Sequence, residues 1–164
     1  MSTDALFHTL VSDDIVRFIK SAEHAVCYAG PGIQEDVARA LLAVMARVGP
    51  EMLTVCLDFD ERVMRMGYGS FDAVSLLRDA GIIVRSAPGL RMALIIADHT
   101  GYLFTPTPLY LEAGPASDAA PNAMRMSGAQ VDEALARLSP AAKAIAVAQA
   151  TTPEEQQRIA ARQV

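Results

Sequence analysis

The sequence predicts one α/β domain whose mixed, largely parallel sheet is covered by helices. Short apolar runs typical of buried strands alternate along the chain with segments whose apolar residues recur every three or four positions, as in amphipathic helices. The 164 residues are enough for one domain with a substantial core. Apolar residue types make up 52% of the chain and charged types 20%, which indicates a globular protein.

The first half of the chain alternates between helices and strands. Ser12 and the two aspartates after it are typical of a helix start, because such side chains interact favourably with the unpaired N–H groups of the first turn. Gly30-Pro-Gly32 and Gly49-Pro50 interrupt the apolar patterns before them and therefore end these elements. The predicted elements are a helix over 12–22, a strand over 24–28, a helix over 33–48 and a strand over 52–57.

A polar loop over 58–69 leads into the second half of the domain. Ser70 caps the next helix, and Gly81 ends it. A strand over 82–85 follows. Segments 90–97 and 102–104 then form a hairpin around Asp98-His99-Thr100-Gly101, which adds an antiparallel pair at the far end of the sheet.

A change in composition divides the chain near residue 112. Residues 1–112 carry the α/β pattern and form the domain. Residues 113–126, which begin Ala-Gly-Pro-Ala-Ser-Asp, are predicted to be a linker or long loop. Residues 127–164 suggest a tail of short Ala-rich helices over 127–138, 140–150 and 153–163. This tail is expected to pack on the sheet or on a second subunit, or to lead to a further domain.

Charge and composition exclude several classes of protein. A net charge of −5 and only two lysines argue against broad, non-specific nucleic-acid binding, which depends on clustered basic residues. No apolar run approaches the roughly 20 residues of a membrane helix, and the first residues lack a secretory signal. Cys27 and Cys56 lie in apolar segments, which is typical of reduced core thiols and predicts a cytoplasmic protein.

The loop that begins Asp58-Phe-Asp60 is one candidate site. Two aspartates after a strand are typical of haloacid-dehalogenase-type phosphatases, but Arg62 occupies the place of the Thr or Val that follows there. A solvated loop whose carboxylates pair with Arg62 and Arg65 is the simpler interpretation. The motifs predict no cofactor and no metal ligands, although a divalent ion bound by Asp58 and Asp60 stays open as an alternative.

The most informative pattern is Ala80-Gly-Ile-Ile-Val-Arg85 followed by Gly89-Leu-Arg-Met-Ala-Leu-Ile-Ile-Ala-Asp98. It resembles the phospholipase-D-like superfamily, in which a helix ends in an Ala-Gly-Ile turn, a strand follows, and the next strand carries His-x-Lys-x4-Asp. The resemblance covers roughly residues 12–112, the length of one half of a phospholipase-D-like unit. It implies a site shared by two such halves, in one chain or in a homodimer.

The catalytic motif of this family is degenerate here. In active members, the histidine is the nucleophile, the lysine holds phosphate oxygens and the aspartate supports the site. Alignment on Asp98 puts Arg91 at the histidine and Ala93 at the lysine. Arginine, with a pKa above ~12, stays protonated and cannot attack phosphorus. His99 lies beside Asp98 at the wrong offset for a nucleophile, and an exposed turn residue is the simpler interpretation.

The leading hypothesis is a catalytically degenerate phospholipase-D-like domain with a binding, assembly or regulatory role. Arg91 then contacts a phosphate-containing ligand, or it forms an ion pair with Asp98 or another carboxylate. The alternatives are a phosphodiesterase or nuclease completed by a partner half or a homodimer, and a metal-binding module that uses the Asp58 loop. Arg91, His99, Asp58 and Asp60 are the candidate ligand contacts.

Overall fold

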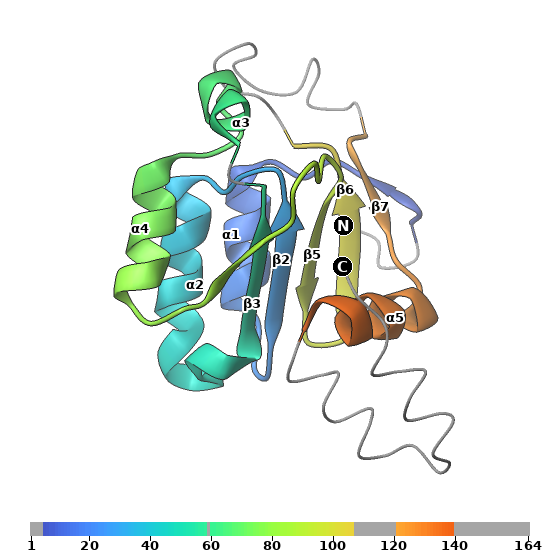
Figure 1. Cartoon of the computed structure of the whole chain (residues 1–164). Coiled ribbons are helices and arrows are strands. Elements are labelled where there is room, and N and C mark those ends of the chain that lie inside the picture. The colour runs from blue at the N-terminus through green and yellow to red at the C-terminus, as the bar shows by residue number, and fades with distance from the viewer. Residues whose placement is uncertain (1–4, 59, 107–120, 140–164) are drawn as a thin grey trace, which may run out of the picture.

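In the computed structural model, residues 5–58, 60–106 and 121–139 are described. They form one seven-stranded sheet with helices on both of its faces (Figure 1). The elements in chain order are β1 (Phe7–His8), α1 (Ser12–Lys20), β2 (Val26–Gly30), α2 (Glu35–Val48), a short 3-10 helix (Pro50–Met52), β3 (Leu53–Leu57), α3 (Glu61–Met66), α4 (Phe71–Asp79), β4 (Val84–Ser86), β5 (Ala93–Ala97), β6 (Thr100–Phe104), β7 (Ala123–Arg125) and α5 (Gly128–Leu138).

The sheet is mixed, with the strand order β1-β7-β6-β5-β2-β3-β4. β2, β3 and β4 are parallel, as the alternation of helices and strands predicts. The predicted hairpin is present as β5 and β6, but it enters the middle of the sheet beside β2. Because β7 and β1 then add further antiparallel pairs, two of the six pairings among the described strands are parallel, fewer than a largely parallel sheet has.

One face of the sheet packs against α1, α2 and α4, and this layer holds the main core (Figure 1). Alternate residues of the central strands point into it, since successive side chains of a strand face opposite ways. Val55 of β3 and Ile95 of β5 are fully buried there, as are Leu41 of α2 and Leu77 of α4. None of the described helices has the length and hydrophobicity needed to cross a membrane.

The other face of the sheet is covered in part by α5, the first helix of the predicted tail. Val131 of α5 is buried against a second apolar cluster that includes Ile96 of β5 and both cysteines, Cys27 and Cys56, which are free thiols. Ser127 caps the helix by accepting a hydrogen bond from the Gln130 N–H. The helices predicted over 140–164 lie outside the described residues.

Two segments predicted as loops contain regular structure. Residues 123–125, predicted to be linker, form β7, whose backbone pairs with both β6 and β1. The polar loop over 58–69 contains α3, which Asp60 caps and which ends at Gly67 in the left-handed conformation. Strands of two or three residues and a helix of six are too short to show hydrophobic periodicity, so the sequence pattern misses them.

Candidate functional site

The candidate site lies at one edge of the sheet, where the parallel strands β2 and β3 end. We call it the site edge. Residues 87–91 cross it on their way from β4 to β5, and the Ala87 N–H donates to the Leu57 carbonyl at 2.7 Å. Because β5 runs antiparallel to β2, the start of β5 reaches the same edge as the end of β2. The fold therefore brings the Asp58 loop and Arg91 together.

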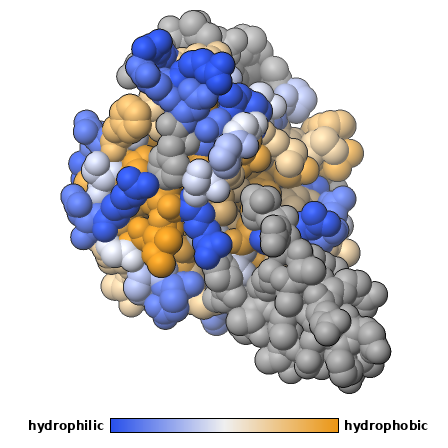
Figure 2. Space-filling view, in the orientation of Figure 1, coloured by the Kyte–Doolittle hydropathy of each residue, from blue (hydrophilic) through white to orange (hydrophobic). Residues whose placement is uncertain are grey.

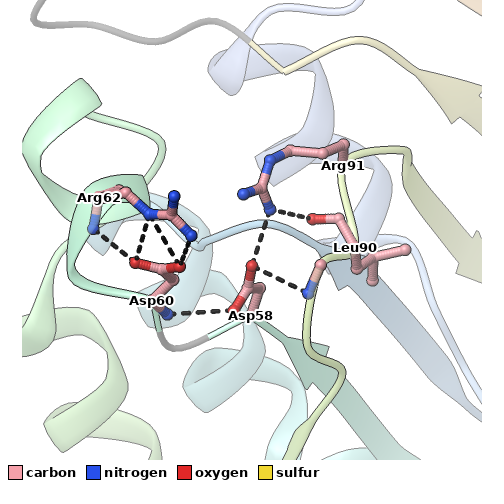
Figure 3. Close-up of polar contacts among 6 residues, drawn as sticks. Asp58, Asp60, Arg62, Leu90 and Arg91 are labelled. Carbon is pink, nitrogen blue, oxygen red and sulfur yellow. Dashed lines mark hydrogen bonds and ion pairs between the residues drawn. The ribbon is translucent and has the colours of Figure 1, made fainter.

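Asp58 lies directly after β3, and its side chain forms hydrogen bonds with residues 87–91, the segment that crosses the site edge. Its side chain is 7% exposed, and its Oδ2 accepts hydrogen bonds from Arg91 Nη1 at 2.7 Å and from the Gly89 N–H at 3.1 Å (Figure 3). Its Oδ1 accepts from the Asp60 N–H at 3.1 Å. The hydrogen bond from Arg91 has the largest effect on the Asp58 carboxyl, and its pKa is lowered despite the burial.

The ion-pair partner of Arg91 is therefore Asp58, the other carboxylate that the sequence analysis leaves open. The Arg91 side chain stays 52% exposed and also donates to the Leu90 carbonyl at 3.1 Å. Sequence reasoning treats Arg91 and Asp58 as separate candidates. The signal that joins them is topological, because the ends of neighbouring strands meet at one edge of a sheet.

Asp60 and Arg62 form a second ion pair beside the first. Arg62 Nη2 lies 2.7 Å from Asp60 Oδ2, and the Arg62 N–H donates to Asp60 Oδ1 at 2.8 Å. The side-chain hydrogen bonds from Arg62 lower the pKa of the Asp60 carboxyl to about 2. Arg65 pairs with Glu61 of its own helix at 2.5 Å and not with either aspartate.

The metal-binding alternative gains no support from this arrangement. Asp58 and Asp60 each hold an arginine, which would compete with a cation for the same oxygens. Within the described ranges, no group of three or more His, Cys, Asp or Glu side chains could hold a metal ion. The loop instead matches the simpler prediction for Asp60, a carboxylate paired with Arg62.

Ala93, at the place of the family's lysine, lies in an apolar environment. It is fully buried in the main core, directly opposite Phe104 on β6. A Cβ at Gly30 would come within 3.2 Å of the Ala93 Cβ, so the neighbouring strand is tightly packed here. The buried hydroxyl of Tyr28 donates to the Gly32 carbonyl at 2.8 Å, and burial raises its pKa. A charged side chain has no place in this packing.

Asp98 and His99 lie at the opposite edge of the sheet. The two residues form the turn between β5 and β6, and Asp98 takes a positive φ of 55°, which Asp tolerates better than most residues. The five residues of β5 separate this turn from Arg91, which at ~3.3 Å per residue is more than about 13 Å. Neither residue can therefore touch the groups at the site edge.

The role of Asp98 is to hold the start of β2. Its carboxylate accepts hydrogen bonds from the backbone N–H groups of Glu23, His24 and Ala25, the shortest at 2.8 Å to His24. Burial disfavours the ionised form, but the three N–H groups outweigh it and lower the pKa of this carboxyl. His99 is exposed in the turn, as the simpler interpretation predicts.

The mixed sheet, its strand order and its helical layers define an α/β unit of the phospholipase-D-like fold. The likeness is to the crystal structure of Nuc from Salmonella typhimurium, a phospholipase D family member. The TM-score is 0.50 and the sequences are 18% identical; the match covers 74% of this chain and 79% of that chain. At this level of identity the comparison establishes the fold alone. No family model and no curated protein matches the sequence.

Proposed function

We propose that this chain is a phospholipase-D-like domain that has lost catalysis and serves in binding, assembly or regulation. Arg91 is its contact for a phosphate-containing ligand. The resemblance assigns the nucleophile to the position of Arg91 and the phosphate-holding lysine to the position of Ala93. The first residue is a cation engaged with a buried aspartate, and the second is a fully buried methyl group. Neither can perform the chemistry that the family assigns to it.

The observation that carries the proposal is the ion pair between Arg91 and Asp58. The buried carboxylate accepts a hydrogen bond from Nη1 of the guanidinium, while about half of the side chain is exposed. A fixed guanidinium suits phosphate oxygens, because it donates parallel hydrogen bonds and keeps its charge at every physiological pH. His99 does not restore a nucleophile, since it lies at the opposite edge of the sheet.

Self-association is a further part of the proposal. The resemblance implies that two half-units meet at one site, which a homodimer would provide. Phe7 of β1 and Met124 of β7 are opposite each other at the end of the sheet and are 61% and 43% exposed, so this end offers apolar surface. A cytoplasmic location is proposed on the two cysteines, which are free and buried.

The test measures hydrolysis of bis(p-nitrophenyl) phosphate and of single-stranded DNA, each with and without EDTA. Wild type, Arg91→Ala and His99→Ala are assayed beside a phospholipase D family nuclease with an intact motif. The expected result is no turnover by any form of this chain, and light scattering of the same wild-type sample is expected to give the mass of a dimer.

Two outcomes would overturn the proposal. Turnover that resists EDTA and disappears in His99→Ala would make the chain an enzyme with a relocated nucleophile. Turnover that EDTA abolishes would instead favour metal-dependent chemistry at the Asp58 loop.

A further inference from the structure

We propose that Arg62 and Arg91 together form a site for the dianionic phosphate group of a phosphomonoester. We call it the two-arginine site. The inference rests on the proposed function, in which Arg91 contacts phosphate, and it adds a second cation and a chemical class of ligand. Arg62 comes from α3, which sequence analysis did not predict, so its approach to Arg91 is visible only in the folded chain.

The first support is that both guanidinium groups are hydrogen-bonded to an aspartate. Arg91 Nη1 lies 2.7 Å from Asp58, and Arg62 grips Asp60 with Nη2 at 2.7 Å and Nε at 3.2 Å. Figure 3 shows the two guanidinium groups on the same side of the two aspartates, each above its own carboxylate. The Asp60 N–H donates to Asp58, so the two ion pairs form one connected network. Arginines ordered in advance lose little conformational freedom when a ligand binds.

The second support is that the two positive charges lie closer to solvent than the two negative charges. The Arg91 and Arg62 side chains are 52% and 78% exposed, whereas Asp58 and Asp60 beneath them are 7% and 27% exposed. An approaching anion therefore meets the cations first, and the repulsion from the deeper carboxylates acts over a longer distance. Hydrophilic residues gather over α3 at this end of the molecule (Figure 2).

The two ion pairs are also close enough to influence one another. Arg62 is the main reason for the lowered pKa of Asp60, and the charge of Arg91 adds to that effect. In the same way, Asp60 chiefly raises the pKa of Arg62, and Asp58 contributes. An anion placed between the guanidinium groups would interact with both.

The donors of Arg62 and Arg91 that are not yet paired indicate which class of ligand fits the site. Within the described part of the chain, the Nε and Nη2 of Arg91 and the Nη1 of Arg62 take part in no hydrogen bond. A terminal phosphate has three free oxygens and a charge near −2, so it can engage both arginines. A phosphodiester offers two free oxygens and a single charge, and it matches the site less well.

The experiment measures binding by calorimetry at pH 7.5 and low salt. The probes are phenyl phosphate, diphenyl phosphate and phenyl sulfate, which represent a dianionic monoester, a monoanionic diester and a monoanion with three free oxygens. Wild type is compared with Arg62→Gln and Arg91→Gln. Arg65→Gln is the matched control, because Arg65 lies on the same helix as Arg62 and pairs with Glu61. Circular dichroism verifies that each variant is folded.

The expected result is binding of phenyl phosphate in preference to both monoanions. Arg62→Gln and Arg91→Gln should each weaken that binding by about tenfold, as expected for lost hydrogen bonds to a charged group. Arg65→Gln should leave it unchanged. Loss in Arg91→Gln with no change in Arg62→Gln would overturn the two-arginine site and leave the proposed function standing. No binding of any probe would overturn both.

Discussion

At each of two edges of the sheet, a partly or fully buried aspartate accepts hydrogen bonds from three groups, but the kinds of donor differ. At one edge Asp98 accepts three backbone N–H groups from residues 23–25 and fastens the start of β2. At the site edge Asp58 accepts two backbone N–H groups, from Asp60 and Gly89, and its third donor is the side chain of Arg91. The donors to Asp98 are all backbone groups, whereas one donor to Asp58 is the exposed, positively charged side chain of Arg91.

This difference separates an aspartate that holds only backbone from one that also positions an exposed side chain. A buried carboxylate that accepts hydrogen bonds from the backbone alone contributes stability and positions the chain around it. A carboxylate satisfied by an exposed arginine positions a group that can still bind another molecule. Asp98 therefore has a structural role, whereas the exposed guanidinium of Arg91 remains accessible to another molecule.

The largest expected effect comes from placing a lysine at position 93. Ala93→Lys would place a charged side chain in a fully buried position opposite Phe104, in packing too tight to admit it. An unpaired buried charge costs on the order of 3–5 kcal/mol. Urea denaturation should show this loss as a lower midpoint, or the variant should fail to fold.

The matched control is Met92→Lys, which adds the same charge next to Ala93 on a side chain that is 57% exposed. This variant should differ from wild type by no more than about 0.5 kcal/mol, as is usual for surface changes. If Ala93→Lys were as stable as Met92→Lys, position 93 could accept a charged side chain, and the proposed loss of catalysis would lose support.

The sequence pattern predicts the central elements well, because strands and helices of five or more residues carry enough apolar residues to show their period. It also predicts the hairpin, but it places the turn over residues 98–101, whereas Thr100 and Gly101 belong to β6. It places the hairpin at the far end of the sheet, since strand order depends on pairings between distant residues that local patterns do not encode. For the same reason it cannot join Asp58 to Arg91, which are 33 residues apart.

The second prediction concerns the backbone network of Asp98. Asp98→Ala removes the acceptor of three N–H groups and puts alanine at a positive φ, so we expect a loss of about 2–3 kcal/mol in the free energy of unfolding. Asp98→Asn keeps one oxygen and tolerates this φ, and it should lose about 1 kcal/mol. Urea denaturation at pH 7 measures both. Equal stability of Asp98→Ala and wild type would contradict the assigned role.

The pH dependence of these variants follows from the direction of the pKa shift. Because the folded-state pKa of Asp98 lies below the unfolded value of about 3.9, its ionised form stabilises the protein fully above that pH. This contribution is lost as the pH falls through the folded-state pKa. The difference in stability between wild type and Asp98→Asn should therefore be constant from pH 7 to about 5 and shrink below about pH 4.

The smallest effects are expected at the two arginines, and their difference tests how far Asp58 depends on Arg91. Arg91→Gln leaves a buried carboxylate with backbone donors only, so we expect a loss of about 1–2 kcal/mol and a rise in the pKa of Asp58. Arg62→Gln breaks a more exposed pair and should cost less than about 0.5 kcal/mol. Acid denaturation of Arg91→Gln should accordingly begin at a higher pH than that of Arg62→Gln. Identical acid profiles would mean that the backbone N–H groups alone keep Asp58 ionised. Arg91 would then have no structural role and could bind a ligand without loss of stability.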